Sequence, residues 1–206
     1  SDKYFTENYS TLLYAAKAGA IKNRPVKNDD PKTRQIEELK GHVKLLTLEL
    51  LEANGGGVGM IGHVMGEQNT AMILSHPLGM LCSDGGAYAP YGPLSTGSPH
   101  PRGYGSFPRL LGHYVRDTGA LTLESAIHKV TRMPALKLGI EDRGVLRMGA
   151  CADVVAFDPD TIADRASFDD PHQYPTGIPH VVVNGALTLR DGEHTGALAG
   201  RGVTAG

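Results

Sequence analysis

The pattern of apolar and polar residues predicts two helices joined by a polar loop near the start of the chain. Residues 4–18 are amphipathic and typical of a helix. Asp30 and Pro31 then form a good helix start, because an aspartate can cap the first turn and a proline fits inside it. From there apolar residues repeat at spacings of three and four until Asn54, which indicates a helix of about twenty residues.

Short apolar runs alternate with an amphipathic segment in the next part of the chain. Residues 58–64 and 78–83 have the composition of strands that are covered on both faces, and residues 67–75 are typical of a short helix. Strand, helix and strand in this order form the repeating unit of a parallel sheet. We therefore expect 58–64 and 78–83 to be neighbouring strands of a parallel α/β barrel.

Two further helices are expected beyond a long glycine-rich and proline-rich loop. Ser106 can cap a helix that has Pro108 in its first turn and runs to Asp117. Thr122 can cap another helix, which Pro134 breaks before a last turn.

From Gly144 onward the pattern changes to short β-rich segments. GVLRMG, ADVVAFD, HVVVNG and ALTLRDG are typical of strands, and the Asn-Gly and Asp-Gly pairs at 184–185 and 191–192 are typical of hairpin turns. We place a domain boundary near residue 142. Residues 1–141 are then the barrel part, and residues 142–206 form a small β domain.

The candidate for chemistry is Asp84, which directly follows the second predicted strand. Gly85 and Gly86 come next and allow a tight turn, because neither carries a Cβ. In parallel barrels the loops after the strands build the active site. Asp84 is therefore a candidate for catalysis or metal binding. The alternative is that it only shapes a turn, as aspartate before glycine often does.

Composition argues against several kinds of partner. Twenty basic and twenty-two acidic residues give a net charge of −2 without a basic block, so nucleic acid and anionic membranes are poor candidates. No apolar run approaches the ~20 residues of a membrane span. Cys82 and Cys151 cannot form a disulfide framework, and Cys82 is expected in a buried strand, so a cytoplasmic, reducing location fits best. A chain that begins at Ser1 suggests a processed product or a piece of something longer.

Four blocks over residues 55–206 carry a resemblance to a known family. They are GMLCSDGG, PHPRGYGSFPRLLGHYVRD, LTLESAIHKVTRMPALKLGIEDRGVLRMGACADVVAFDPDTI and HVVVNGALTLRDGEHTGALAGR. In this order they resemble the carboxyl-terminal part of the N-acyl-D-amino-acid deacylases, or D-aminoacylases, of the metal-dependent amidohydrolase superfamily. The resemblance implies an α/β fold, namely the C-terminal part of a (β/α)8 TIM barrel plus a small β-sandwich domain.

The resemblance also implies an activity and roles for individual residues. The activity is zinc-dependent hydrolysis of N-acyl-D-amino acids to a D-amino acid and a carboxylate, with one or two zinc ions. Asp84 matches the metal ligand that is also the catalytic acid/base, and Arg102 matches the arginine that binds the α-carboxylate of the substrate. His100 and His63 are further candidates for substrate binding, although a lone histidine on a strand is more often structural.

The chain departs from the family in its metal ligands. It contains no His-x-His pair, and a catalytic zinc needs about three protein ligands. We therefore expect most ligands to lie in the remaining N-terminal portion of the same enzyme, which would be an obligatory partner for activity. Two strands also cannot close a barrel, and their edges would stay exposed.

Two alternatives remain open. The first is another amidohydrolase, such as a hydantoinase-like or dihydropyrimidinase-like cyclic amidase, which shares the aspartate but not the HPR segment around Arg102. The second is a non-catalytic interaction module that has lost its metal. Activity on cyclic amides would favour the first, whereas bound zinc together with loss of turnover on Asp84→Asn would contradict the second.

Overall fold

The computed structural model describes residues 30–56, 59 and 61–204. The chain divides into two compact units, Ser1–Met60 and Ile61–Gly206. The helix predicted over residues 4–18 lies outside the described residues, and the domain boundary near residue 142 stays a prediction. None of the helices in the described ranges has the length and apolarity that a membrane crossing needs.

The long helix predicted in the first unit is confirmed as α2 (Pro31–Ala53). Asp30 caps it, since its Oδ1 accepts a hydrogen bond of 3.2 Å from the backbone N–H of Lys32. Asn54 ends it, and its side-chain amide donates to the carbonyl of Leu50 at 2.8 Å. No residue of α2 is buried, so its apolar side chains face solvent.

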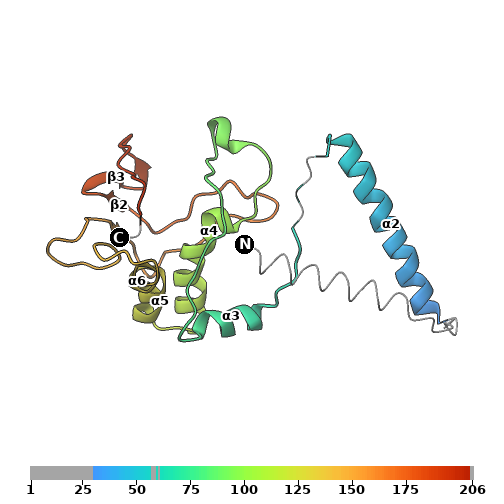
Figure 1. Ribbon diagram of the computed structural model, residues 1–206, viewed down its shortest axis with the longest axis horizontal. Helices are drawn as coiled ribbons and strands as arrows, with labels where there is room; N and C mark the ends of the chain where they lie inside the picture. The colour runs from blue at the N-terminus through green and yellow to red at the C-terminus, as the bar shows by residue number, and fades with distance from the viewer. Residues whose placement is uncertain (1–29, 57–58, 60, 205–206) are drawn as a thin grey trace. The chain divides into compact units, whose positions relative to one another are not determined.

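The second unit contains a cluster of short helices, of which α3, α4, α5 and α6 are labelled in Figure 1. They are α3 (Glu67–Ser75), the 3-10 helix η1 (Gly92–Ser95), α4 (Arg102–Arg109), the π-helix η2 (Leu110–Asp117), α5 (Leu123–Val130) and α6 (Arg132–Lys137). Thr122 caps α5 as predicted, since its hydroxyl accepts from the N–H of Ser125 at 3.2 Å.

Two predicted helix boundaries are wrong. The helix expected to begin at Ser106 begins at Arg102, and Ser106 lies inside it, where its hydroxyl donates to the carbonyl of Arg102 at 2.8 Å. The chain breaks at Thr131 rather than at Pro134. Pro134 falls in the first turn of α6, where its missing N–H has no partner to lose.

A four-stranded antiparallel sheet follows the helices, in the order β1 (Val154–Ala156), β2 (His180–Val183), β3 (Ala186–Arg190) and β4 (Glu193–His194). Both predicted hairpin turns are confirmed, and all four turn residues have φ between 48° and 83°. Positive φ at both central positions is typical of a type I′ turn, which matches the twist of the strands. The GVLRMG segment forms no strand.

The two predicted barrel strands are not formed within the described residues. Residues 61–64 and 78–83 have no hydrogen-bonded strand partner, and Cys82 is exposed rather than buried. The physical reason is that an apolar run indicates a segment suited to cover on both faces, whereas a strand also needs neighbouring strands to pair with. Such neighbours are absent from the described part of this chain.

The core of the second unit lies between the helices. Leu110, Tyr114, Leu121 and Ala126 form its buried centre. Lys129 is also buried, and its ammonium donates to the carbonyl of His76 and, at 2.9 Å, to that of Gly79. These bonds hold the turn after α3 against α5.

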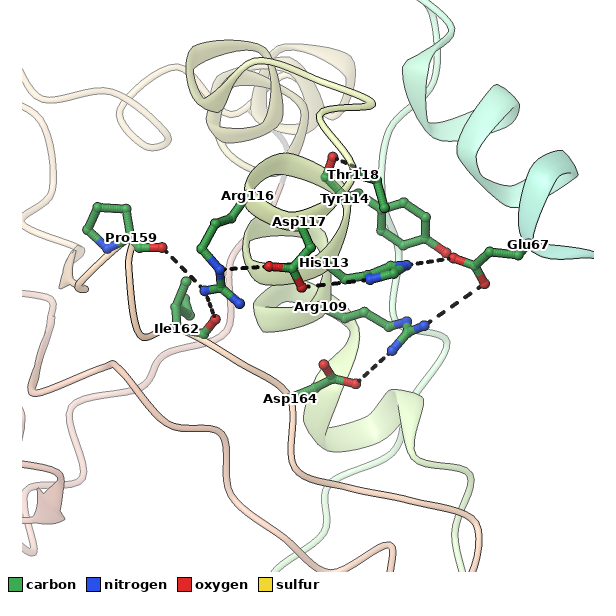
Figure 2. Close-up of polar contacts among 10 residues, drawn as sticks. All are labelled: Glu67, Arg109, His113, Tyr114, Arg116, Asp117, Thr118, Pro159, Ile162 and Asp164. Atoms are coloured by element: carbon green, nitrogen blue, oxygen red, sulfur yellow. Dashed lines mark hydrogen bonds and ion pairs between the residues drawn. The ribbon is translucent and has the colours of Figure 1, made fainter.

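A polar network fastens α3 to the π-helix, as Figure 2 shows. Glu67 accepts hydrogen bonds from Tyr114 and, at 3.0 Å, pairs with His113, while Arg109 bridges to Asp164 at 3.3 Å. The pKa of Glu67 is lowered, most by the Tyr114 hydroxyl and less by His113 and Arg109, although desolvation acts in the opposite direction. The network therefore stabilises the ionised carboxylate and joins segments that are distant in sequence.

Candidate active site

The structure brings Asp84 and Arg102 together. Arg102 Nη2 lies 2.7 Å from Asp84 Oδ2, and Arg102 Nε donates to the backbone carbonyl of Asp84 at 3.0 Å. Arg102 is the first residue of α4, and Asp84 lies in the glycine-rich loop that precedes it. The Asp84 side chain is 81% exposed, so the carboxylate is open to water and to a ligand.

Glycines set the position of this pair. A Cβ on Gly85 would lie 2.7 Å from the Cα of Gly103 in the first turn of α4, and a Cβ on Gly103 would lie 2.8 Å from the Tyr88 ring. Side chains at either position would push the loop off the helix. Asp84 itself has φ of 47°, a left-handed conformation that aspartate tolerates better than most residues.

His63 and His100 lie on either side of Phe168. The Phe168 ring centroid is 4.6 Å from that of His63 and 5.1 Å from that of His100, both in edge-to-face geometry. His100 Nδ1 accepts a hydrogen bond of 3.0 Å from the backbone N–H of Arg102. Burial, and then the charges of Arg102 and His63, lower the pKa of His100, so its neutral form is favoured at pH 7.

Sequence reasoning missed the residues that the 157–177 segment contributes. Besides Phe168, His172 Nδ1 lies 2.9 Å from the Tyr104 hydroxyl, and the rings of Tyr88 and Tyr174 lie 6.2 and 5.8 Å from that of Tyr104. Burial is the main cause that raises the pKa of Tyr174 to about 12. The only signal in the sequence was the presence of aromatic residues in the long stretch between the β-rich segments ADVVAFD and HVVVNG.

The described residues do not make a zinc site on their own. Within these ranges, no group of three or more His, Cys, Asp or Glu side chains converges in a way that could hold a metal ion. Asp84 offers one carboxylate, and one of its oxygens is paired with Arg102. Catalytic zinc needs about three protein ligands, so no step of a reaction can be derived through zinc from these residues.

Comparison with known proteins places the site in a family. The family model Amidohydro_3, for the amidohydrolase family, matches residues 58–189. The chain therefore belongs to the amidohydrolase family. N-acyl-D-glutamate deacylase from Alcaligenes xylosoxydans xylosoxydans is 47% identical over 131 residues, which are 64% of this chain and 25% of the relative. The chain thus spans about a quarter of the length of this curated relative.

Solved structures of two relatives have a similar fold. One is a D-aminoacylase described with a binuclear metal centre, with a TM-score of 0.62, 42% identity, and coverage of 68% of this chain and 28% of the relative. The other is N-acyl-D-glutamate deacylase from Bordetella bronchiseptica with zinc and a phosphonate inhibitor, with a TM-score of 0.55, 47% identity, and coverage of 60% and 25%. The predicted fold class, α/β of the (β/α)8 amidohydrolase type, is confirmed.

A second, shorter similarity concerns a different kind of protein. Chromosome-associated kinesin KIF4B from Homo sapiens is 45% identical over 56 residues, which are 27% of this chain and 4% of the kinesin. So small a share of the kinesin carries no argument for motor activity. The amidohydrolase match begins at residue 58, so α2 lies outside it.

Proposed function

We propose that this chain is the C-terminal part of a zinc-dependent deacylase of N-acyl-D-amino acids, which is active together with the N-terminal portion of the barrel. The observation that carries the proposal is the contact between Asp84 and Arg102, a carboxylate and a guanidinium 2.7 Å apart. Both residues lie inside the stretch that matches the amidohydrolase family. Two of the relatives act, by their names, on N-acyl-D-glutamate and on N-acyl-D-aspartate.

Asp84 is the proposed acid/base. Amide hydrolysis needs a group that accepts a proton from the attacking water and returns it to the leaving nitrogen. An exposed carboxylate on a loop that α4 holds in place can do both in turn. Attack of the water oxygen forms the new C–O bond, and departure of the protonated nitrogen breaks the C–N bond.

Arg102 is the proposed site for the α-carboxylate of the substrate. A guanidinium presents a planar fork of donors that pairs with both oxygens of a carboxylate. Its ion pair with Asp84 is exposed, with side-chain exposures of 44% and 81%, and such pairs contribute at most about 1 kcal/mol. A substrate carboxylate can therefore replace Asp84 on Arg102 at little cost, which leaves Asp84 available to the water.

Residues around Asp84 and Arg102, and ligands outside this chain, complete the proposed site. His63 and His100, which flank Phe168, form one wall of the substrate site. Zinc would be held mainly by ligands outside this chain, with Asp84 as one ligand. Cys82 and Cys151 form no disulfide, which supports a reducing cytoplasm as the compartment.

The experiment measures turnover by the enzyme that contains this chain and the missing barrel portion. N-acetyl-D-amino acids, their L-enantiomers and cyclic amides such as hydantoin are compared. We expect turnover of the D-substrates only, and Asp84→Asn lowers kcat about a hundredfold or more. Turnover of the cyclic amides alone would overturn the proposal in favour of a cyclic amidase, and an absence of turnover would favour an interaction module.

A matched control exists for Asp84. Asp191 is also followed by glycine, has φ of 53° and carries a side chain that is 81% exposed. Asp191→Asn removes a charge in the same local geometry but far along the chain, so kcat stays unchanged. Equal losses in the two variants would mean that Asp84 acts through its turn rather than through its chemistry.

Arg102→Lys tests the carboxylate site separately. Lysine keeps the charge but loses the planar fork, so KM rises about tenfold or more while kcat changes less. A variant with unchanged KM would remove Arg102 from the proposal. With a substrate whose α-carboxylate is replaced by an amide, wild type and Arg102→Lys should have the same KM.

A further inference from the structure

Helix α2 carries a regular apolar seam. Its members alternate at spacings of three and four residues, which is the a and d pattern of a heptad repeat. The seam consists of Ile36, Leu39, Val43, Leu46 and Leu50. Lys32 holds the d position before Ile36, in the first turn of the helix, and no charged residue interrupts the seam between Ile36 and Leu50.

The seam lies open in the structure. Its side chains are between 52% and 63% exposed, and α2 as a whole buries no residue. Apolar surface left in water carries a free-energy cost that is proportional to the area that could be buried. A row of such residues on one helix therefore indicates an interaction surface rather than scattered surface leucines.

The order of residue types along the seam indicates which occupant fits. The β-branched residues Ile36 and Val43 occupy a positions, and Leu39 and Leu46 occupy d positions. This combination favours two parallel strands over trimers and tetramers, because the branched side chains pack well at a and leucine packs well at d. In a parallel pair each seam residue meets its own counterpart, so the fitting partner is a second copy of the same helix.

The residues beside the seam permit this pairing. In a parallel pair Gln35 of one copy lies beside Lys40 of the other, and His42 lies beside Thr47. Neither contact places like charges together. The residues that flank the seam between Gln35 and Thr47 therefore do not oppose association of two copies, and the one like-charge contact, between the two Lys32 side chains, lies in the first turn of the helix.

We propose that α2 is a self-association helix through which two copies of this chain pair in parallel and in register along the seam. The two seams together would bury roughly 1,000 Å², which is at the lower end of specific interfaces. The pair is accordingly weak, with a dissociation constant on the order of micromolar. Association does not depend on the proposed catalytic roles of Asp84 and Arg102.

The first test compares two leucines of α2 that differ only in their place on the helix. Leu46 lies in the seam and Leu45 lies beside it, and both are 58% exposed. The full chain is studied by sedimentation equilibrium over about a hundredfold range of concentration. We expect Leu46→Lys to raise the dissociation constant about tenfold or more, and Leu45→Lys to leave it unchanged. Equal effects of the two variants, or no effect of Leu46→Lys, would overturn the proposal.

The second test reads the contact and its direction by disulfide formation. Ile36→Cys is made in a chain that also carries Cys82→Ser and Cys151→Ser, and Leu48→Cys, on the opposite side of α2, is the control. A disulfide needs Cα atoms within about 7 Å, so only Ile36→Cys should cross-link in a glutathione buffer. Cross-linking between Ile36→Cys and Leu46→Cys chains, with none between two Ile36→Cys chains, would mean an antiparallel pair, in which a positions face d positions, and would overturn the parallel arrangement. Equal cross-linking at both positions would overturn the seam itself.

Discussion

Helices α2 and α5 both carry apolar residues at helical spacing, yet in the part of the chain that the structure describes α5 is covered and α2 is not. Ala126 of α5 is fully buried at 0% exposure, and Lys129 is buried beside it, whereas α2 buries no residue. α5 packs against the π-helix and contributes to the core of its unit. The difference teaches that a periodic pattern specifies a helix and its apolar face, but not whether the cover for that face is in the same chain.

The two helices differ in what lies against their apolar faces. The second unit covers its helices with side chains and with close backbone contacts, some of which leave no room for a Cβ. Among the described residues nothing buries α2, and the proposed self-association would supply its cover, so changes in α2 should affect the monomer only through the helix itself. Substitutions of the same kind should therefore have opposite or very different effects in the two regions.

The largest expected effect is at Gly177, in the second unit. Its φ is 79°, and a Cβ there would lie 2.5 Å from the Cα and N atoms of Ile162, which is itself 1% exposed. Gly177→Ala should lower the stability of the second unit by about 2–4 kcal/mol, since it adds left-handed strain to a clash with backbone. Hydrogen exchange of peptides from residues 154–194 should speed up, while peptides from α2 should not change.

Gly185 is the matched control for that substitution. It has φ of 82°, but nothing lies within 4 Å of its Cβ position. Gly185→Ala therefore adds the strain of the left-handed conformation without the clash. If Gly185→Ala and Gly177→Ala destabilise the unit equally, close packing around Ile162 is not what holds this region together.

Features that rest on local rules were predictable from the sequence. Asp30 and Thr122 cap helices as expected, and the Asn-Gly and Asp-Gly pairs at 184–185 and 191–192 turn as expected, because each feature depends on a few adjacent residues. The position of Phe168 between His63 and His100 was not predictable. It depends on the path of a long segment without periodicity, and no short-range rule fixes such a path.

In the candidate site, too, the individual residues were predictable from the sequence, but the contact between them was not. Asp84 and Arg102 were each picked out from the sequence, but their 2.7 Å contact follows from the close approach of Gly85 and Gly103, which no spacing pattern reveals. The predicted strand at 78–83 failed for a related reason. Apolar composition describes the environment that a segment suits, whereas strand pairing depends on which other segments are present.

A smaller effect is expected at Glu67, which fastens α3 within the second unit. In the folded protein the pKa of Glu67 is lowered, first by the Tyr114 hydroxyl. The ionised carboxylate therefore stabilises the unit fully above pH 4.5, its ordinary pKa, and this stability is lost as the pH falls through the lower pKa of the folded state. Glu67→Gln should destabilise the unit at pH 7 by about 1 kcal/mol or less, because the side chain is 59% exposed and water screens its ion pairs.

The pH dependence separates the charge of Glu67 from its packing. The difference between wild type and Glu67→Gln, measured as the urea midpoint by circular dichroism, should shrink as the pH is lowered below about 4.5. Glu141→Gln is the control, since among the described residues the Glu141 side chain has no ion pair or hydrogen bond. A difference that persists at low pH would mean that Glu67 acts by shape and not by charge.

The smallest effect is expected at Gly41, in the middle of α2, and it should have the opposite sign to that at Gly177. Nothing lies within 4 Å of the Cβ position of Gly41, which is on the side of the helix away from the seam. Gly41→Ala should stabilise α2 by about 0.5 kcal/mol, because alanine loses less conformational freedom in a helix. Amides of α2 should exchange about twofold more slowly, and association should strengthen slightly because more of the chain is helical before pairing. Faster exchange would mean that a second surface covers this side of α2, and the contrast between an uncovered α2 and a covered α5 would then no longer hold.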